Sequence, residues 1–255
     1  MLEILRLIMP ALTEDEIHKI AAVEERQWWY RGTRDICFSL LHPFIAGRTS
    51  MDILDVGCGT GGNLLRLNHY GRARGIDVDP LCVDYCRQKG LDVSLGSMEA
   101  LGQPRASLDL LTMFDVLNQA EPREAVGIVS GMADVLRPGG IIAFREPAMP
   151  MARGWHDQAV NIRQRFTTAG VSALFLAAGF QPLRITYLNT LLFPPIVLLR
   201  QFQRSRQPKL AKSDVEDTRE PINSVLLALL RLEGTALRGM NLPFGVSLFA
   251  VGKKT

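Results

Sequence analysis

The sequence has few of the residues that mark metal centres or disulfide scaffolds. Four cysteines and four histidines occur in 255 residues, and the cysteines form neither a Cys-x-x-Cys pair nor a dense disulfide pattern. Cys82 and Cys86 lie one helical turn apart, but no second pair of Cys or His accompanies them, which argues against a metal site. The cysteine usage therefore indicates reduced thiols and predicts a cytoplasmic protein.

Long apolar runs and internal repeats are also missing. Glu3 and Arg6 interrupt the apolar segment 1–10, and no small-residue cleavage site follows it, so we predict neither a signal peptide nor a transmembrane helix. The net charge of +3 is too small to indicate a nucleic-acid partner. With 47% hydrophobic residues, the chain can form one α/β domain with insertions or two small domains.

A glycine-rich stretch organises the chain. The mainly apolar run 51–54 stops at the acid Asp55 and opens into Gly57, Gly59 and Gly61, which predicts a buried strand, a tight turn and a helix. Side chains at the glycines would keep a ligand away from the backbone. Dinucleotide-binding folds use Gly-x-Gly-x-x-Gly to hold a pyrophosphate, whereas the spacing here is Gly-x-Gly-x-Gly. A glycine-rich turn without a ligand is the alternative interpretation.

A second strand that ends at an acid follows about twenty residues later. The run 74–77 closes with Asp77, whose two carboxylate oxygens match the two vicinal hydroxyls of a ribose. Asp79 and Pro80 then cap a helix, which gives Asp79 a structural role. The remaining strands are expected at 91–95, within 108–119 together with an exit loop, and at 141–144, 183–187 and 246–251.

Two helices are expected before the glycine-rich stretch. Thr13, followed by three acids, predicts the start of a helix that runs toward Arg31. The run 36–44 predicts a second, amphipathic helix. Between them, Trp28-Trp29-Tyr30 cannot all face one side of a helix, so these rings either pack in the core or cover a ligand pocket.

The motif Asp-Val-Gly-Cys-Gly-Thr-Gly at 55–61 resembles motif I of the class I S-adenosylmethionine (SAM) methyltransferases. The Trp-Trp-aromatic run before an Arg and the Leu-Arg-Pro-Gly-Gly turn at 136–140 resemble the same family. Asn-x-x-x-Phe-Pro-Pro at 189–195 and Leu-Pro-Phe-Gly at 242–245 resemble insertions in a bacterial branch of it, so the resemblance covers nearly the whole chain. It implies an α/β, Rossmann-like sheet of seven strands whose last strand is antiparallel. The implied organisation is an N-terminal helical cover (1–48), a SAM-binding core (49–187), a helical insertion between the last two strands (188–245) and the final strand of the core (246–255).

The resemblance also implies the residues that bind SAM. Family members commonly have Asp where Ser97 stands, so a Ser97 hydroxyl or the backbone at Met98 would contact the adenine. Arg34 would meet the cofactor's carboxylate, or is simply a solvated helix charge. The implied cofactor set is Asp55, Gly57, Cys58, Gly59, Gly61, Asp77, Val78, Ser97, Met98, Phe114 and Arg34, with no metal.

The usual imidazoles of the family are replaced in this chain. Asn118-Gln119 stands where relatives often have Glu-His, and Asn161 stands where they have His. His156 is then the candidate general base, with a role in shaping the pocket as the alternative. Tyr30 is a second candidate at the catalytic site. The missing imidazoles weigh against a hydroxyl acceptor more than against an amine or an activated carbon.

The expected function is methyl transfer from SAM to a small molecule of secondary-metabolite, glycan or lipid biosynthesis, by in-line displacement. A SAM-binding enzyme with non-methyl chemistry, a catalytically silent SAM-binding partner and a nicotinamide-dependent oxidoreductase remain as alternatives. The insertion 188–245 is expected to form the acceptor-side wall and to favour a bulky or apolar acceptor; packing on the last strand or a homo-oligomer contact is the alternative. A basic cluster leaves open a peripheral membrane contact: Arg200, Arg204, Arg206, Lys209 and Lys212.

Overall fold

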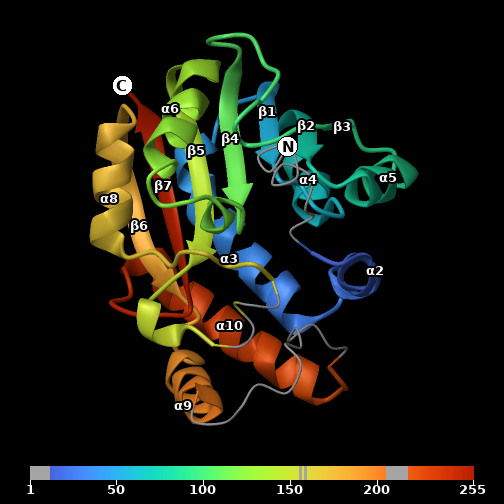
Figure 1. Ribbon diagram of the computed structural model, residues 1–255, viewed down its shortest axis with the longest axis vertical. Coiled ribbons are helices and arrows are strands. Elements are labelled where there is room, and N and C mark those ends of the chain that lie inside the picture. The colour runs from blue at the N-terminus through green and yellow to red at the C-terminus, as the bar shows by residue number, and fades with distance from the viewer. Residues whose placement is uncertain (1–11, 155–156, 158–159, 205–217) are drawn as a thin grey trace, which may run out of the picture.

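A computed structural model describes residues 12–154, 157, 160–204 and 218–255. A seven-stranded sheet runs through the molecule, with helices on both faces (Figure 1). Its strand order is β3-β2-β1-β4-β5-β7-β6, and only β7 runs antiparallel to its neighbours. The strands are β1 (Met51–Val56), β2 (Gly71–Asp77), β3 (Val93–Leu95), β4 (Leu108–Phe114), β5 (Leu136–Pro147), β6 (Phe180–Leu188) and β7 (Ser247–Lys254). The predicted α/β fold with seven strands is confirmed.

The order of the strands defines where a ligand can bind. From β1 the chain builds outward through β2 to β3, then returns to the other side of β1 to form β4 and β5. In open α/β sheets, ligands bind outside the carboxyl ends of the strands at this reversal. We therefore expect a ligand-binding site at the end of the sheet near Val56 and Phe114.

Alternating side chains of the strands build two cores. Ile53 and Leu110 face a cluster with α3 (Trp28–Ile45) and α4 (Gly62–Leu67), whereas their neighbours Leu54 and Leu111 face a cluster with α6 (Ala125–Val135) and α8 (Thr168–Ala177). This alternation follows from the two-residue period of a strand. Helix α5 (Pro80–Gln88) begins at Asp79, whose carboxylate accepts a hydrogen bond from the Leu81 N–H at 2.8 Å, as predicted.

The predicted fifth strand is too short. Leu136 already pairs with Leu108, and an irregularity follows before Ile141 pairs with Leu110. The Arg-Pro-Gly-Gly residues 137–140 therefore interrupt β5 instead of preceding it. Gly139 adopts a φ of 75° there, a conformation that glycine reaches without a steric penalty.

The first two helices divide at a different residue from the one predicted. Helix α2 (Glu14–Val23) starts at Thr13 as expected but ends well before the aromatic run. Gln27 caps α3, because its side-chain oxygen accepts hydrogen bonds from the N–H groups of Trp29 (2.8 Å) and Tyr30 (3.3 Å). The three aromatic residues thus form the first turn of α3, which brings them to the end of the sheet where β1 and β4 finish.

The chain between β6 and β7 contains α9 (Phe193–Arg204) and α10 (Ile222–Gly239). Helix α10 packs along α3, where Gly32 allows a close approach: a Cβ on this residue would lie 2.5 Å from Leu230 Cδ1. Helix α9 packs on the short turn η2 (Pro150–Ala152), which follows β5, through Phe193 and Val197. Both helices lie below the carboxyl ends of β1 and β4 in Figure 1.

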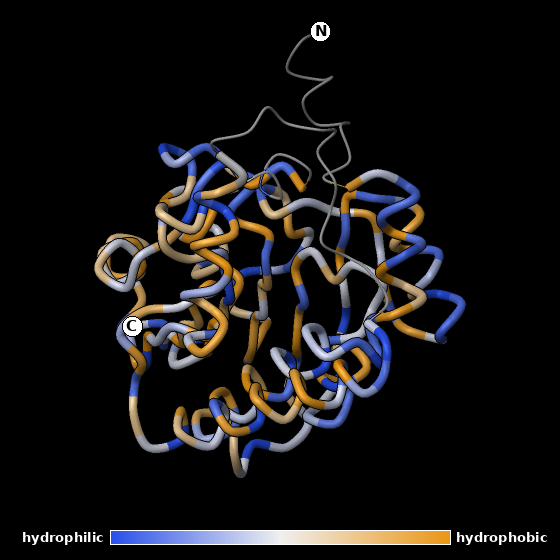
Figure 2. Tube along the Cα trace, turned by 90° about the horizontal axis from the view of Figure 1, so that it is seen from below, coloured by the Kyte–Doolittle hydropathy of each residue, from blue (hydrophilic) through white to orange (hydrophobic). Residues whose placement is uncertain are grey.

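Viewed from that end, hydrophobic residues concentrate in the central strands and along the sides of the flanking helices (Figure 2). Over the described ranges, no helix combines the length and the hydropathy needed to cross a bilayer.

Candidate cofactor and acceptor site

The glycine turn joins β1 to α4 and contacts two neighbouring strands. Gly57 has a φ of 67° and Gly59 a φ of 54°, values that L-residues rarely adopt. The Gly57 N–H donates to the Ile76 carbonyl at 2.8 Å, and a Cβ on Gly57 would lie 2.3 Å from Val116 Cγ2 in the loop after β4. Around Gly59, by contrast, no described atom lies within 4 Å of a Cβ position. The turn is therefore tightly held on one side and open to a ligand on the other.

Asp77 closes β2 directly beside this turn. Its Oδ2 accepts a hydrogen bond from the Gly59 N–H at 2.8 Å, and its Oδ1 accepts one from the Asp79 N–H at 2.9 Å. Burial raises the pKa of Asp77, while these backbone donors oppose the shift. Each oxygen of a carboxylate has two lone pairs, so both oxygens can still accept a hydroxyl donor.

Apolar side chains lie around Asp77. Val78 follows it and is 50% exposed, although it is aliphatic. The Gly96 N–H donates to the Asp77 carbonyl at 3.0 Å, which brings the turn with Ser97 and Met98 next to this carboxylate. Ser97 and Met98 are half-buried, and Met98 packs on the core. An acid with two acceptor oxygens between apolar neighbours fits a nucleoside, whose ribose carries hydroxyl groups and whose base has two flat, apolar faces.

Asp55 lies at the carboxyl end of β1 and is almost fully buried. Its Oδ1 accepts a hydrogen bond from Thr112 Oγ1 at 2.6 Å, and its Oδ2 has no hydrogen-bond partner among the described residues. Burial raises the pKa of Asp55 to about 7, because the Thr112 hydrogen bond only partly offsets the loss of solvation. One acceptor atom of this predicted cofactor residue is thus buried without a partner among the described residues.

Three further residues that were predicted to bind the cofactor have structural roles or contacts within the protein. The thiol of Cys58 faces that of Cys86, and this contact together with burial raises the pKa of Cys58. Gly61 is the N-cap of α4, with a φ of 95°. Phe114 ends β4, and its ring lies under the guanidinium of Arg145, at 5.6 Å from the ring centroid.

Arg34 lies next to the glycine turn but is paired with protein acids. Its Nη1 binds Glu25 Oε1 at 2.7 Å, and its Nη2 donates to the Glu24 carbonyl at 3.1 Å. A Cβ on Gly62 would lie 2.3 Å from Arg34 Nη2, which places the guanidinium at the first turn of α4. Glu25 is exposed, so water or a ligand carboxylate can replace it at little cost.

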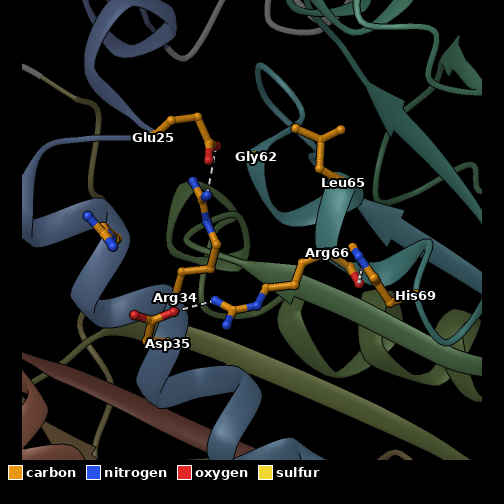
Figure 3. Close-up of a pocket in the computed structure, with 8 residues that line it drawn as sticks. Glu25, Arg34, Asp35, Gly62, Leu65, Arg66 and His69 are labelled. Carbon is orange, nitrogen blue, oxygen red and sulfur yellow. Dashed lines mark hydrogen bonds and ion pairs between the residues drawn. The ribbon is translucent and has the colours of Figure 1, made fainter.

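A cavity of about 280 Å³ opens on the outer side of this arginine. Arg34 points toward Glu25 across it, while Asp35 and Arg66 form a second ion pair (Figure 3). Its lining residues are Glu25, Arg31, Arg34, Asp35, Gly62, Leu65, Arg66 and His69.

The loop after β4 is anchored by Glu146, a buried residue at the end of β5 that the sequence analysis did not single out. Its carboxylate accepts hydrogen bonds from the N–H groups of Val116 (3.1 Å), Leu117 (2.8 Å) and Asn118 (3.1 Å), and from Asn118 Nδ2 (2.8 Å). Burial raises the pKa of Glu146 to about 8, although these donors favour the ionised form. Asn118 therefore helps to hold the conformation of this loop. The signal that pointed to Asp55 and Asp77, an acid closing an apolar strand, was also present here.

The two predicted catalytic residues have different outcomes. Tyr30 is half-buried, and burial raises its pKa, with Glu16 and Asp115 adding to the shift. Its hydroxyl stays protonated at neutral pH and can donate a hydrogen bond, but it cannot act as a base. His156 lies outside the described residues. Its neighbour Asp157 is buried and bound by Arg165 through both oxygens, at 2.6 and 2.7 Å.

Within the described ranges, no cluster of three or more His, Cys, Asp or Glu side chains is arranged to hold a metal ion.

Comparison with known proteins agrees with this geometry. Residues 53–140 match the family model described as a methyltransferase domain. Aklanonic acid methyltransferase DauC of Streptomyces sp. (strain C5) is 34% identical over 111 residues, covering 39% of this chain and 49% of the relative. The tRNA N(3)-cytidine methyltransferase METTL2 of Xenopus tropicalis is 22% identical over 174 residues, covering 57% and 51%. The chain spans about half the length of these curated relatives.

Among solved structures, a complex of the Haloferax volcanii Trm112 methyltransferase activator with a putative methyltransferase has a TM-score of 0.58. It is 17% identical and covers 94% of this chain and 98% of the matched one. The sheet order and the glycine turn are those of the class I SAM-dependent methyltransferase fold, and residues 53–140 match a methyltransferase domain. SAM is the cofactor of the proteins in this class.

Proposed function

We propose that this chain transfers the methyl group of SAM to a small-molecule acceptor. The observation that carries the proposal is Asp77, held by the Gly59 N–H beside an open glycine turn, with acceptor capacity left on both oxygens. Two acceptor oxygens in this position suit the two ribose hydroxyls of SAM.

The neighbouring residues take the other parts of the cofactor. Val78 and Met98 flank the adenine, and Ser97 contacts its edge. The open backbone at Gly59 admits the methionine part. Arg34 binds the cofactor's carboxylate when that group replaces the exposed Glu25, which keeps the number of ion pairs unchanged.

Bound SAM supplies a sulfonium whose methyl carbon is attacked in line by a lone pair of the acceptor. The chain's contribution is to orient the two reactants and exclude water. Glu146 holds the loop after β4 against the glycine turn, where Val116 contacts Gly57. Tyr30 supplies a hydroxyl that can donate a hydrogen bond at the same end of the sheet.

Apolar surface on the acceptor side favours a small, bulky or apolar acceptor. Trp29, Met149 and Ile196 are partly buried and pack on the cluster that joins α9 to η2. Such a wall suits an apolar body better than a polyanion. The competing acceptor is tRNA, the substrate named for one relative, but a net charge of +3 provides little attraction for it.

Label transfer tests this function. The full chain is incubated with SAM carrying a labelled methyl group and, separately, with a small-molecule extract and with total tRNA. We expect label in a small molecule, formed together with S-adenosylhomocysteine, and markedly less label when Asp77→Ala is used at the same, subsaturating SAM concentration. Label in tRNA would overturn the acceptor class, and a small-molecule product that forms without S-adenosylhomocysteine would indicate non-methyl chemistry.

A further inference from the structure

Asp115, the first residue after β4, adopts a left-handed backbone conformation. Its φ is 61°, a value that is uncommon for residues other than glycine and that Asp and Asn adopt more readily than most. Its N–H donates to the Arg145 carbonyl at 2.7 Å, and its Oδ2 accepts a hydrogen bond from Arg145 Nη2. Non-glycine residues that are held in rarely adopted backbone conformations are enriched at functional sites.

In the ion pair of Asp115 and Arg145, the cation is mostly buried and the anion is exposed to solvent. The Arg145 side chain is 12% exposed and lies over Phe114, whereas the Asp115 side chain is 42% exposed. Arg145 is therefore fixed, and it leaves acceptor capacity on a carboxylate that faces solvent. A buried arginine in this geometry orients the acid without covering it.

The position of Asp115 is the one where methyl transfer would occur. The pairing of β1 with β4 brings Val56 next to Met113, so Asp115 lies two residues beyond this pair, at the reversal of the sheet. Val116, its neighbour, contacts Gly57 of the glycine turn. The cofactor site on the β1–β2 side and the acceptor side at β4–β5 meet at this residue.

The charges around Asp115 favour a group that carries N–H donors. Besides burial, the negative charges of Glu16, Glu24 and Asp115 all raise the pKa of Tyr30. The positive charge of Arg145 opposes this shift. Together with burial, the negative charge of Asp115 also raises the pKa of the Glu146 carboxyl group. An excess of acids over cations stabilises positive charge that develops beside them.

We propose that Asp115 binds the nucleophilic nitrogen of an amine acceptor, and that Arg145 is the positioning residue that orients this carboxylate. The inference rests on the proposed function. The nitrogen lone pair forms the C–N bond, and the electrons of the C–S bond remain on sulfur. The positive charge thus moves from sulfur to nitrogen, next to Asp115, and the proton of the new ammonium leaves to solvent afterwards.

Sinefungin provides a probe that does not require the acceptor to be known, because it carries an amine where SAM carries its methyl group. Calorimetry measures the affinities of sinefungin and S-adenosylhomocysteine for the full chain and for Asp115→Asn, which tolerates the same φ. We expect the preference for sinefungin to fall about tenfold in Asp115→Asn, with the affinity for S-adenosylhomocysteine unchanged.

Asp109→Asn is the matched control, because Asp109 lies on the same strand, at its opposite end, and pairs with Arg137 at the surface. This variant should keep the preference of the unmodified chain. Arg145→Lys, which retains the cation, should largely keep the preference, whereas Arg145→Met should lower it. A purely structural role of Arg145 would instead weaken both ligands equally.

An unchanged preference in Asp115→Asn, or an equal loss for both ligands, would overturn the proposal. If Asp115→Asn does not fold, Asp115→Gly removes the carboxylate at a position where glycine is favourable, and the same two outcomes decide. Failure of the unmodified chain to bind S-adenosylhomocysteine would refute the proposed function instead, so the two failures are distinguishable.

Discussion

Three acids lie at the carboxyl ends of β1, β2 and β5, yet each has a different set of partners. Asp77 is bound by two backbone N–H groups and keeps capacity for a ligand, whereas Glu146 is saturated by four donors of one loop. Asp55 lies between these cases, with one oxygen bound by Thr112 and one without a partner. The type and position of a residue are therefore visible in the sequence, while its role depends on the donors that reach it.

Asp55 should make the stability of the protein depend on pH. Its pKa in the folded protein is about 7, above its ordinary value of 3.8, so the folded state holds the proton more tightly than the unfolded chain. The stabilisation of the folded state that results from this tighter proton binding is fully present below about pH 4 and is lost as the pH rises through about 7. Without cofactor, the free energy of unfolding should fall by about 2 kcal/mol more in the unmodified chain than in Asp55→Asn between about pH 5.5 and pH 8.

Chemical denaturation of both proteins over this range provides the measurement. The difference between them isolates Asp55 from Glu146, whose raised pKa is common to both. Parallel pH profiles would mean that Asp55 is ionised in the folded protein throughout.

The pair of Asp115 and Arg145 shows what the sequence could not predict at this scale. Thirty residues separate the two, and their contact depends on the pairing of Phe114 with Arg145 between β4 and β5. It also depends on the left-handed φ of Asp115, which no local pattern announces. Asp77 and the glycines could be predicted because their geometry is local to one strand end.

At the scale of elements, the boundary between the first two helices illustrates a limit of periodicity. Residues 13–44 have helical spacing almost throughout, so the break at Gln27 is decided by one side chain that caps the N–H groups of Trp29 and Tyr30. One glycine in α3 and one in α10 are a second example. Gly32 and Gly234 let the helices approach closely, and only the packing shows that each faces the other helix.

The role of α9 as an acceptor wall can be tested with two substitutions on opposite faces. Ile196 is half-buried and packs on the same cluster as Trp29, whereas Leu198 is 67% exposed. Once label transfer has identified the acceptor, Ile196→Ser should raise its KM roughly tenfold through the loss of apolar contact. The affinity for SAM should not change.

Leu198→Ser carries the same chemical change on the outer face and should leave the kinetics unaltered. Equal KM values for both variants and the unmodified chain, with both proteins folded, would mean that α9 only packs on its neighbours.

At the scale of the whole molecule, the seven-stranded sheet and its antiparallel last strand agree with the prediction, because the motifs that carry the family resemblance occur in sequence order. The positions of α9 and α10 could not be predicted from their apolar faces, since such a face does not indicate which surface it covers. Their contacts with η2 and α3 assign them to the end of the sheet where the glycine turn and Asp77 lie.

The central claim is that this end of the sheet binds SAM through Asp77, and calorimetric titration of SAM tests it most directly. The full chain, Asp77→Ala and the control Asp109→Asn are titrated with SAM and with NAD, and circular dichroism verifies that each variant is folded. We predict that the unmodified chain and Asp109→Asn bind SAM and do not bind NAD, and that Asp77→Ala loses at least about tenfold in affinity for SAM, as expected for hydrogen bonds to an ionised group. Unchanged SAM affinity in folded Asp77→Ala, or binding of NAD in preference to SAM, would contradict the account.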